Sequence, residues 1–307
     1  MSRKNKPDTA TGVLIINKHE GVTSHRIVQI LRKMYDTPRV GHTGTLDPMA
    51  TGVLPILLGR AVKASDFLLS EEKEYIAGLK LGVTTDTLDT TGEILKTSDK
   101  IPPEAEVIEA AKSFIGNIEQ IPPMYSAIKI GGQKLVDLAR SGETVERKPR
   151  AVEIKELEVE KIADDEYKMR VVCSKGTYVR TLCNDIGEKL GCGGAMSSLV
   201  RIRTGNFTLE GSYTIEDLEK MTFEERVELP VPTVKLFDDL SQISVNDFYA
   251  KLVRGGTELY QKKLGTKFEV GTRVKIMHGE TFLALGEVAE FEGGSAVKPI
   301  KLFDLGE

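Results

Sequence analysis

This sequence of 307 residues lacks several features that would place it in common protein classes. No stretch approaches the roughly 18 consecutive apolar residues that a membrane helix needs. The N-terminal residues, MSRKNKPDTA, are polar and basic, and they lack the apolar segment of a secretory signal. The chain has no internal repeat and no low-complexity segment. We therefore expect a cytoplasmic protein without membrane contact.

Cysteine and histidine are scarce, and their spacing does not indicate a metal site. The three cysteines, Cys173, Cys183 and Cys192, form no CxxC pair, so reduced thiols are favoured over disulfides or zinc ligands. The four histidines lie at positions 19, 25, 42 and 278, without any spacing typical of metal ligands. We expect no metal ion in this protein.

The charge is small overall but unevenly distributed. The formal net charge is −4, yet residues 1–65 contain ten Lys or Arg against four Asp or Glu. A local excess of cations is typical of a surface that meets phosphates. Hydrophobic residues make up 40% of the chain and charged residues 29%, which is ordinary for a protein with a sizeable core.

Periodicity along the chain predicts alternating strands and helices. Buried strands are expected over Gly12–Lys18 and Val53–Gly59, and the alternation of Glu72–Gly82 predicts a third strand. Thr23-Ser24 is expected to cap a helix. Further elements are a helix over residues 104–116, a strand pair from VEIKELEVEKI and EYKMRVVCSKG, and a helix that ends at Gly191.

Two segments differ from this pattern. Ile121–Arg150 is punctuated by Pro122-Pro123 and Gly131-Gly132 and is rich in Lys and Arg, which indicates a mobile excursion that contacts a polyanion or, alternatively, a plain surface helix over Lys134–Arg140. Residues 240–307 contain short strands, including a hairpin around His278-Gly279, and favour a compact β-barrel-like unit.

The most informative segment is Gly41–Gly52, GHTGTLDPMATG, which offers one carboxylate, Asp47, among glycines and threonines. Glycine permits a ligand to approach the backbone closely. The segment is too rich in glycine to pack a core, so it favours a reactive carboxylate on a shaped loop. The alternative is that Asp47-Pro48 only forms a turn or begins a helix.

Five segments together resemble the TruB family, the bacterial tRNA pseudouridine synthases that act on the T-loop. They are NKHEGVTSH (Asn17–His25), GHTGTLDPMATGVLPILLGRAVK (Gly41–Lys63), EKEY (Glu72–Tyr75), TDTLDTTG (Thr85–Gly92) and KGTYVRTLCNDIG (Lys175–Gly187). IPPMYSAIKIGGQ resembles the family's insertion, and SSLVRIRTGNF (Ser197–Phe207) resembles a later family segment. The string GxTGTLDPxATG is far more specific than a short glycine motif.

The resemblance implies an α+β fold. A catalytic domain over residues 11–237, after a disordered tail of residues 1–10, would contain a long mixed, mainly antiparallel sheet flanked by helices, with the active-site cleft across its middle. The insertion, residues 121–150, would contact RNA. Residues 240–307 would form a PUA-type RNA-binding domain.

The implied activity is the isomerisation of uridine to pseudouridine at position 55 of the tRNA T-loop. The N1–C1′ bond is cut, the uracil rotates, and the base is rejoined through C5. No atom is oxidised and no bond is hydrolysed, so we expect no cofactor. The partner is tRNA through its T-stem-loop, no obligate protein partner is expected, and the protein is expected to be a monomer.

The resemblance carries the family's essential aspartate to Asp47. Such a carboxylate attacks C6 of uracil, attacks C1′ of the sugar or deprotonates C2′, and the sequence leaves these routes open. Arg180 matches the arginine that pairs with this aspartate and keeps it ionised. Tyr75 matches the tyrosine that stacks on the flipped base. Tyr178 and Leu199 match further residues of the pocket.

Other matched positions surround this set. His42 is implied to contact RNA and to help hold the flipped conformation. Lys18 and Lys63 match basic positions at the pocket rim, where they would contact phosphates. Asp89 is expected to orient a basic neighbour such as Lys63, or to cap a turn.

The chain also departs from the family pattern at its RNA-binding periphery. Val136 stands where the insertion usually has an aromatic residue. Gly194-Ala195 replaces a pair that often includes histidine, and Val200 replaces a frequent arginine. These changes would alter affinity for RNA without altering the reaction.

The sequence disfavours three other functions. A guide-RNA-dependent relative is disfavoured, because that branch lacks the long insertion and this chain has it. A non-catalytic RNA-folding protein is disfavoured by the intact Asp47, Tyr75 and Arg180. A hydrolase is disfavoured because no second acid or metal motif accompanies Asp47.

Overall fold

The computed structural model describes residues 8–68 and 72–304. Its centre is a mixed sheet with the strand order β1-β3-β12-β4-β11-β10-β7, in which β2 also pairs with β3 and β13 with β12. Only β3 and β12 run parallel; the other strand pairs of this sheet are antiparallel. The predicted α+β fold with a mixed, mainly antiparallel sheet is therefore confirmed.

The strands of this sheet come from most of the chain. They are β1 (Gly12–Lys18), β2 (Val40–His42), β3 (Thr51–Leu58), β4 (Lys73–Leu81), β7 (Gly116–Gln120), β10 (Arg150–Lys161), β11 (Glu166–Cys173), β12 (Gly194–Thr204) and β13 (Phe207–Thr208). Two small hairpins stand apart from it, β5 (Val83–Thr85) with β6 (Ile94–Thr97), and β8 (Lys129–Ile130) with β9 (Gln133–Lys134).

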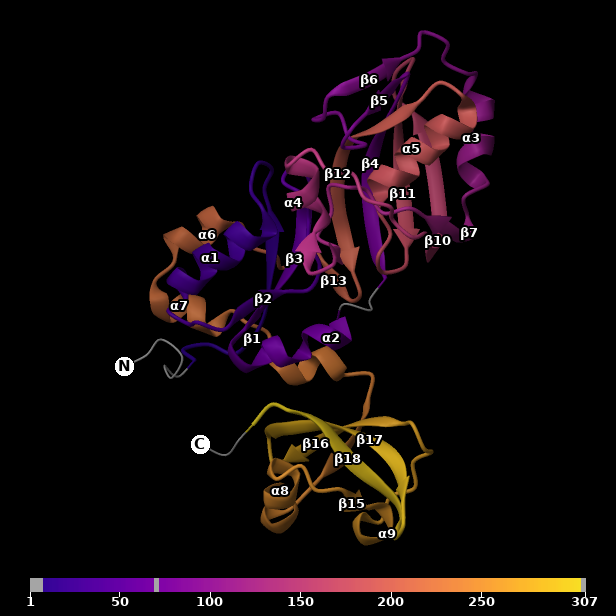
Figure 1. Ribbon diagram of the computed structural model, residues 1–307. Coiled ribbons are helices and arrows are strands. Elements are labelled where there is room, and N and C mark those ends of the chain that lie inside the picture. The colour runs from indigo at the N-terminus through magenta and orange to yellow at the C-terminus, as the bar shows by residue number, and fades with distance from the viewer. Residues whose placement is uncertain (1–7, 69–71, 305–307) are drawn as a thin grey trace.

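Helices cover the sheet in two groups (Figure 1). One group, α3 (Glu104–Lys112) and α5 (Val179–Leu190), lies over the strands β4, β10, β11 and β12. The other lies near β1, β2 and β3 and contains α1 (Ser24–Met34), α6 (Ile215–Lys220) and α7 (Phe223–Glu228). Their apolar faces and the sheet enclose one large core, whose buried residues run from Ala10 to Leu218.

Local chemistry explains where the principal helices begin and end. Thr23 caps α1, because its side chain accepts a hydrogen bond from the Arg26 amide, as the sequence predicted. Gly191 ends α5 in the left-handed conformation with φ of 72°. The helix predicted over residues 104–116 is shorter than expected: α3 ends at Lys112, and Gly116, with φ of 107°, begins β7.

The N-terminal tail is shorter than predicted where the structure describes it. We expected disorder over residues 1–10, of which 1–7 lie outside the described residues. Asp8 forms an ion pair with Arg39 at 2.7 Å, and Ala10 is buried. The prediction is therefore wrong for residues 8–10, because polar and apolar contacts both hold them.

The insertion, residues 121–150, folds partly as predicted. It contains the β8–β9 hairpin and a short helix, α4 (Leu135–Arg140). Leu135 and Leu138 are buried and anchor this helix. The structure thus supports the alternative of a surface helix for this part, and its mobility stays a prediction.

A second sheet forms near the C-terminus, with the order β14-β16-β17-β18-β15. Its elements are β14 (Ser241–Ser244), α8 (Asp247–Arg254), β15 (Leu259–Tyr260), α9 (Gln261–Leu264), β16 (Arg273–His278), β17 (Thr281–Phe291) and β18 (Gly294–Leu302). The predicted hairpin around His278-Gly279 is confirmed by the pairing of β16 with β17. The assignment of this unit to the PUA type stays a prediction.

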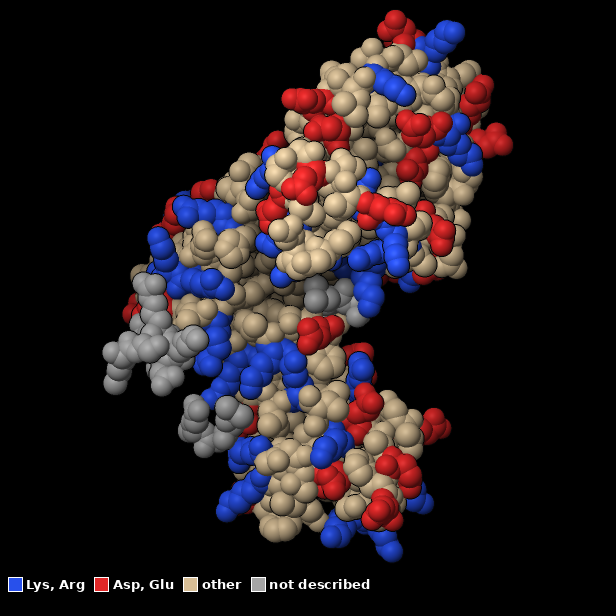
Figure 2. All heavy atoms as spheres, in the orientation of Figure 1, with Lys and Arg blue, Asp and Glu red and all other residues tan. Residues whose placement is uncertain are grey.

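Aromatic and polar contacts join the two sheets through the segment Gly59–Leu68, a 3-10 helix followed by α2 (Ser65–Leu68), and a second 3-10 helix, Thr233–Phe237. Phe237 of this second 3-10 helix packs against Phe282 of β17 with ring centroids 5.7 Å apart. The Lys63 ammonium donates to the Leu302 carbonyl at 2.8 Å. Figure 2 shows Lys and Arg side chains gathered on the displayed face where the two units meet.

Candidate active site

The predicted reactive loop joins β2 to β3, and hydrogen bonds fix it along its length. The Ser24 hydroxyl, at the start of α1, accepts from the Leu46 amide at 2.8 Å and donates to the Leu46 carbonyl at 3.0 Å. The Pro48 carbonyl accepts from the Gly21 amide at 2.8 Å. The Ala50 amide donates to the Asp47 carbonyl at 3.1 Å, so Asp47-Pro48 begins a turn and not a helix. The carboxylate is thus presented on a rigid loop.

Two glycines of this loop are required by their surroundings. Gly52 has φ of 100°, and a Cβ there would lie 2.2 Å from the Arg201 carbonyl oxygen. Gly44 has φ of 115°, which strains any other residue, although a Cβ there would only touch the Arg201 guanidinium at 3.6 Å. Gly41, in contrast, has ordinary backbone geometry and room for a side chain. The glycine-rich composition therefore lets the loop approach Arg201 closely.

Asp47 opens into a cavity of about 260 Å³ in the middle of the large sheet, as predicted for the cleft. Tyr75 on β4 and Leu199 on β12 line it, together with Tyr178 and Arg180 at the start of α5. Its volume is close to the lower end of the roughly 300–1,000 Å³ typical of ligand sites. The structure therefore brings together five of the residues that the sequence singled out.

Arg180 is the residue that holds Asp47. Its Nη2 lies 3.0 Å from Asp47 Oδ2, and its Nη1 lies 3.3 Å from Asp89 Oδ2. The same guanidinium donates to the carbonyls of Thr87, at 3.0 Å, and Tyr125, at 2.8 Å. Only 6% of the Arg180 side chain is exposed. Four acceptors thus fix its orientation toward the cavity.

Asp89 supports this arginine from behind. Its Oδ1 accepts from the Thr91 hydroxyl at 2.6 Å, the Thr91 amide at 3.1 Å and the Thr87 hydroxyl at 2.9 Å. The expectation that Asp89 caps a turn is confirmed. The expectation that Asp89 orients a basic neighbour is confirmed as well, but this neighbour is Arg180 and not Lys63.

Opposing effects act on the pKa of the Asp47 carboxyl. Burial in the protein raises the pKa of its carboxyl, and neighbouring Asp89 raises it further, whereas Arg180 and Lys18 lower it. The net direction is upward, although 35% of the side chain is exposed to the open cavity. The cations therefore limit the rise in pKa that enclosure alone would produce.

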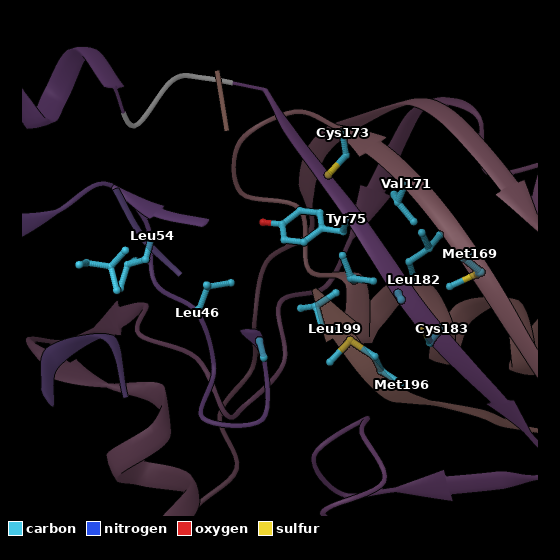
Figure 3. Close-up of a cluster of buried hydrophobic side chains, with 14 of the residues drawn as sticks. Leu46, Leu54, Tyr75, Met169, Val171, Cys173, Leu182, Cys183, Met196 and Leu199 are labelled. Atoms are coloured by element: carbon cyan, nitrogen blue, oxygen red, sulfur yellow. The ribbon is translucent and has the colours of Figure 1, made fainter. Parts of the chain in front are cut away.

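The tyrosines that form the aromatic walls of the cavity are uncharged. Burial raises the pKa of the Tyr75 and Tyr178 phenols above the ordinary value. Tyr75 is 6% exposed, and Figure 3 shows its ring extending from β4 toward the side on which Leu46 lies. Gln120 fixes Tyr178, because its Oε1 accepts from the Tyr178 amide at 3.0 Å. Both rings are thus placed to pack against a planar guest.

Lys18 and Lys63 do not lie where the resemblance implied. Lys18 is fully buried, and its ammonium donates to the carbonyls of His19, Val22 and Pro48 at 2.9, 2.8 and 3.2 Å. It supports the Asp47 loop from beneath, and burial lowers its pKa to about 8. Lys63 lies at the junction with the C-terminal sheet. The expected position at the cavity rim is wrong for both lysines.

His42 ends β2 and does not line the cavity of Asp47. Its Nδ1 is buried without a hydrogen-bond partner among the described residues. Burial, with smaller contributions from Arg201 and His25, lowers the pKa of its imidazole. The ring is therefore held in the neutral form, and its contact with RNA stays a prediction.

Arg201 is a site residue that sequence reasoning missed. It is fully buried on β12, lines the cavity, and donates to the carbonyls of Val53 at 2.7 Å and Gly44 at 3.2 Å. In the sequence, RIRT looks like a strand that places both arginines on one face. A β-bulge between Arg201 and Arg203 separates them, and single-sequence patterns do not show such a bulge.

Further groups line or adjoin the cavity. Tyr125, Ser126 and Ala127 come from the insertion, and Lys73 and Lys175 are cations of the lining. Val136, one of the departures from the family pattern, lines a neighbouring hollow that also reaches Asp47. No group of three metal-ligating side chains occurs in residues 8–68 and 72–304. No helix in the same ranges is long and apolar enough to cross a membrane.

This combination of fold and site corresponds to one family of enzymes. A sequence model of the TruB family pseudouridylate synthase N-terminal domain matches residues 32–179, and one of the tRNA pseudouridylate synthase B C-terminal domain matches residues 180–234. With the close relatives below, these matches confirm the resemblance. The chain belongs to the TruB family of pseudouridylate synthases, which are isomerases.

Particular relatives match over almost their whole length. The tRNA pseudouridine synthase B of Clostridium tetani is 43% identical over 289 residues, which are 94% of this chain and 98% of the relative. That of Alkaliphilus oremlandii is 45% identical over 279 residues, 90% and 93% of the two chains. A chain of a solved Cbf5-Nop10-Gar1 complex is 28% identical with a TM-score of 0.72, covering 98% of this chain and 88% of that one.

Proposed function

We propose that this chain isomerises uridine to pseudouridine at position 55 in the T-loop of tRNA, with Asp47 as the essential carboxylate and without a cofactor. The family supports the reaction, and the relatives from Clostridium and Alkaliphilus, named for tRNA, support the class of substrate. The chemistry is an exchange of bonds within one nucleotide. The N1–C1′ bond breaks, C5 bonds to C1′, C5 loses its proton and N1 gains one.

One observation carries this proposal: Asp47 is the single carboxylate among the described residues that line the cavity, and Arg180 is bound to it. Hydrolysis of a glycosidic bond typically uses two carboxylates that flank the bond. Isomerisation needs one ionised carboxylate beside the sugar, whether it attacks C6, attacks C1′ or removes the C2′ proton. The single carboxylate of this cavity fits isomerisation better than hydrolysis.

Base flipping follows from the enclosure of this carboxylate. A uridine in a folded RNA loop is stacked, and it reaches an enclosed cavity only by leaving its stack. Tyr75, Leu199 and Tyr178 provide aromatic and apolar surface for the base. We assign Tyr75 to stacking on the uracil, and Arg180 to orienting Asp47.

Contacts outside the cavity would hold the RNA backbone. Arg39, Arg60 and Lys301 lie close enough to Lys63 to lower the pKa of its ammonium, after the larger effect of burial. Figure 2 shows a cationic face where the two units meet. Together with His42 and the insertion, this face would bind the T-stem-loop as a monomer, in the cytoplasm. Phosphate contacts of this kind make binding depend on salt.

The experiment that tests this function is tritium release from transcribed tRNA that contains [5-³H]uridine. Release by the wild-type chain is expected, because C5 exchanges its hydrogen for the sugar carbon. A transcript with cytidine in place of the T-loop uridine is the control and should release no tritium. Release that persists from this control would contradict the proposed site. Tight binding of tRNA without release would favour an RNA-folding protein instead.

A further inference from the structure

We propose that Arg201 is a positioning residue that fixes the Asp47 loop from both sides, beside Tyr75. The inference rests on the proposed function, because its effect is measured on that reaction. Arg201 lies on β12, where it pairs with Gly52 at the end of the loop, and it lines the cavity. The sequence analysis assigned it no role, although it stands in the segment SSLVRIRTGNF.

The hydrogen bonds of Arg201 bracket the reactive carboxylate. Its Nη2 donates to the Gly44 carbonyl, three residues before Asp47, and its Nε donates to the Val53 carbonyl, six residues after it. A guanidinium is a rigid planar fork, so the two bonds set the separation of the two loop ends. Loss of either bond would release one end of the loop.

Tyr75 is the third neighbour of Arg201. The two residues are directly opposite each other across β12 and β4, so their side chains lie on the same face of the sheet, and both line the cavity. Burial raises the pKa of the Tyr75 phenol, and the Arg201 guanidinium lowers it by a smaller effect. The group that holds the loop therefore also borders the aromatic wall of the cavity.

The burial of Arg201 indicates that this arrangement costs free energy. The side chain is 0% exposed, and no carboxylate of the described residues forms an ion pair with it. A buried cation without a counter-ion is costly unless hydrogen bonds compensate it. Here the neutral carbonyls of Val53 and Gly44 do so. Gly52 and Gly44, which leave space for the backbone and the guanidinium of Arg201, belong to the same arrangement.

A β-bulge directs the side chain into the cavity. Arg201 pairs with Tyr75, but Arg203 pairs with Glu74, so Ile202 is the extra residue on β12. Adjacent residues of β4 face opposite sides of the sheet. Arg203 therefore lies on the other face, where it binds Glu72 at 2.6 Å and Glu74 at 2.9 Å. The two arginines of RIRT therefore bind different partners on opposite faces of the sheet.

This separation provides a matched pair of variants in the full chain. Arg201→Lys keeps the positive charge but replaces the fork by one ammonium, which cannot span both carbonyls in the same geometry. Arg203→Lys makes the same change on the other face. We expect Arg201→Lys to lower kcat by about 10- to 100-fold, because a small misplacement of reacting groups has effects of this size. KM for the T-stem-loop should change less than about threefold, and Arg203→Lys should change kcat less than about twofold.

Two further readouts separate positioning from general damage. Amide hydrogen exchange over residues 43–53 should become faster in Arg201→Lys while the melting temperature stays close to that of the wild type. The acid limb of the rate profile should stay at the pH of the wild type, because Arg201→Lys keeps the positive charge. If the charge alone mattered, Arg201→Lys would be as active as the wild type, and the inference would be overturned.

The outcomes also distinguish this inference from the proposed function. An inactive wild type with tight tRNA binding contradicts the proposed function. An active wild type with an Arg201→Lys variant of equal kcat contradicts the positioning role alone. A rise in KM at unchanged kcat would likewise overturn it, because Arg201 would then act in RNA binding.

Discussion

The ion-pair chain Asp89–Arg180–Asp47 makes a quantitative prediction about stability. Arg180 and Asp89 each have 6% of their side chain exposed, and their charged atoms lie 3.3 Å apart. In Arg180→Met, Asp89 would stay buried without its cation, and the carbonyls of Thr87 and Tyr125 would lose a donor. Removal of one partner from a buried pair typically costs about 3–5 kcal/mol.

The three hydrogen bonds from Thr87 and Thr91 partly compensate Asp89, so we expect the lower end of this range, about 3 kcal/mol. The double variant Arg180→Met/Asp89→Asn removes the orphaned charge. It should recover about 1–2 kcal/mol relative to Arg180→Met, which is a coupling of the size found for contacting residues. The order of stability should be wild type, Asp89→Asn, the double variant, and Arg180→Met.

The assay is urea unfolding followed by circular dichroism, with the free energy of unfolding obtained by linear extrapolation. The slope of the transition must stay constant for the comparison to hold. A loss below about 1 kcal/mol for Arg180→Met would refute the reasoning, because the pair would then behave like an exposed one. So would a double variant that is less stable than Arg180→Met.

Three further outcomes follow from the site. Because burial raises the pKa of Asp47, the acid limb of the pH–rate profile should lie above 3.8, the ordinary pKa of an aspartic acid. Because Arg180 lowers this pKa, the limb should move to higher pH in Arg180→Met. A wild-type limb at or below pH 3.8 would contradict this. Gly52→Ala should lower the free energy of unfolding by about 3 kcal/mol or more, whereas Gly41→Ala should change it by less than about 1 kcal/mol. Thermal unfolding measures both, and equal losses would be inconsistent with the geometry of the two glycines. Lys18 has a pKa of about 8 in the fold against 10.5 ordinarily, so the unfolded chain binds more protons than the folded chain between these pH values. The free energy of unfolding of the wild type, relative to that of Lys18→Met, should therefore rise as the pH rises from about 8 to about 10. A difference that stays constant over this range would argue against the lowered pKa.

Local sequence chemistry predicted the regular elements well. The strand Gly12–Lys18 has the bounds expected from its apolar run, and the start of α1 follows from the Thr23 cap. These features depend on residues close together in the chain. The extended end of α3 was wrong because Gly116 opens a strand that pairs with β10, and that pairing comes from a distant segment.

The site was predictable where the family motifs define it and not elsewhere. Asp47, Tyr75 and Arg180 meet in one cavity, as the resemblance implied. Arg201 was invisible because its direction depends on a bulge, and Lys18 was misplaced because its burial depends on carbonyls that the fold brings to it. Backbone acceptors of this kind carry no signal in the sequence.

The central claim is that the Asp47 carboxylate performs the chemistry in this cavity. The most direct test compares tritium release by the wild type and by Asp47→Asn, which has nearly the same shape but cannot ionise, at saturating enzyme and in a single turnover. We predict that Asp47→Asn binds the tRNA transcript as tightly as the wild type and releases no tritium. Release by Asp47→Asn at the rate of the wild type would contradict the account.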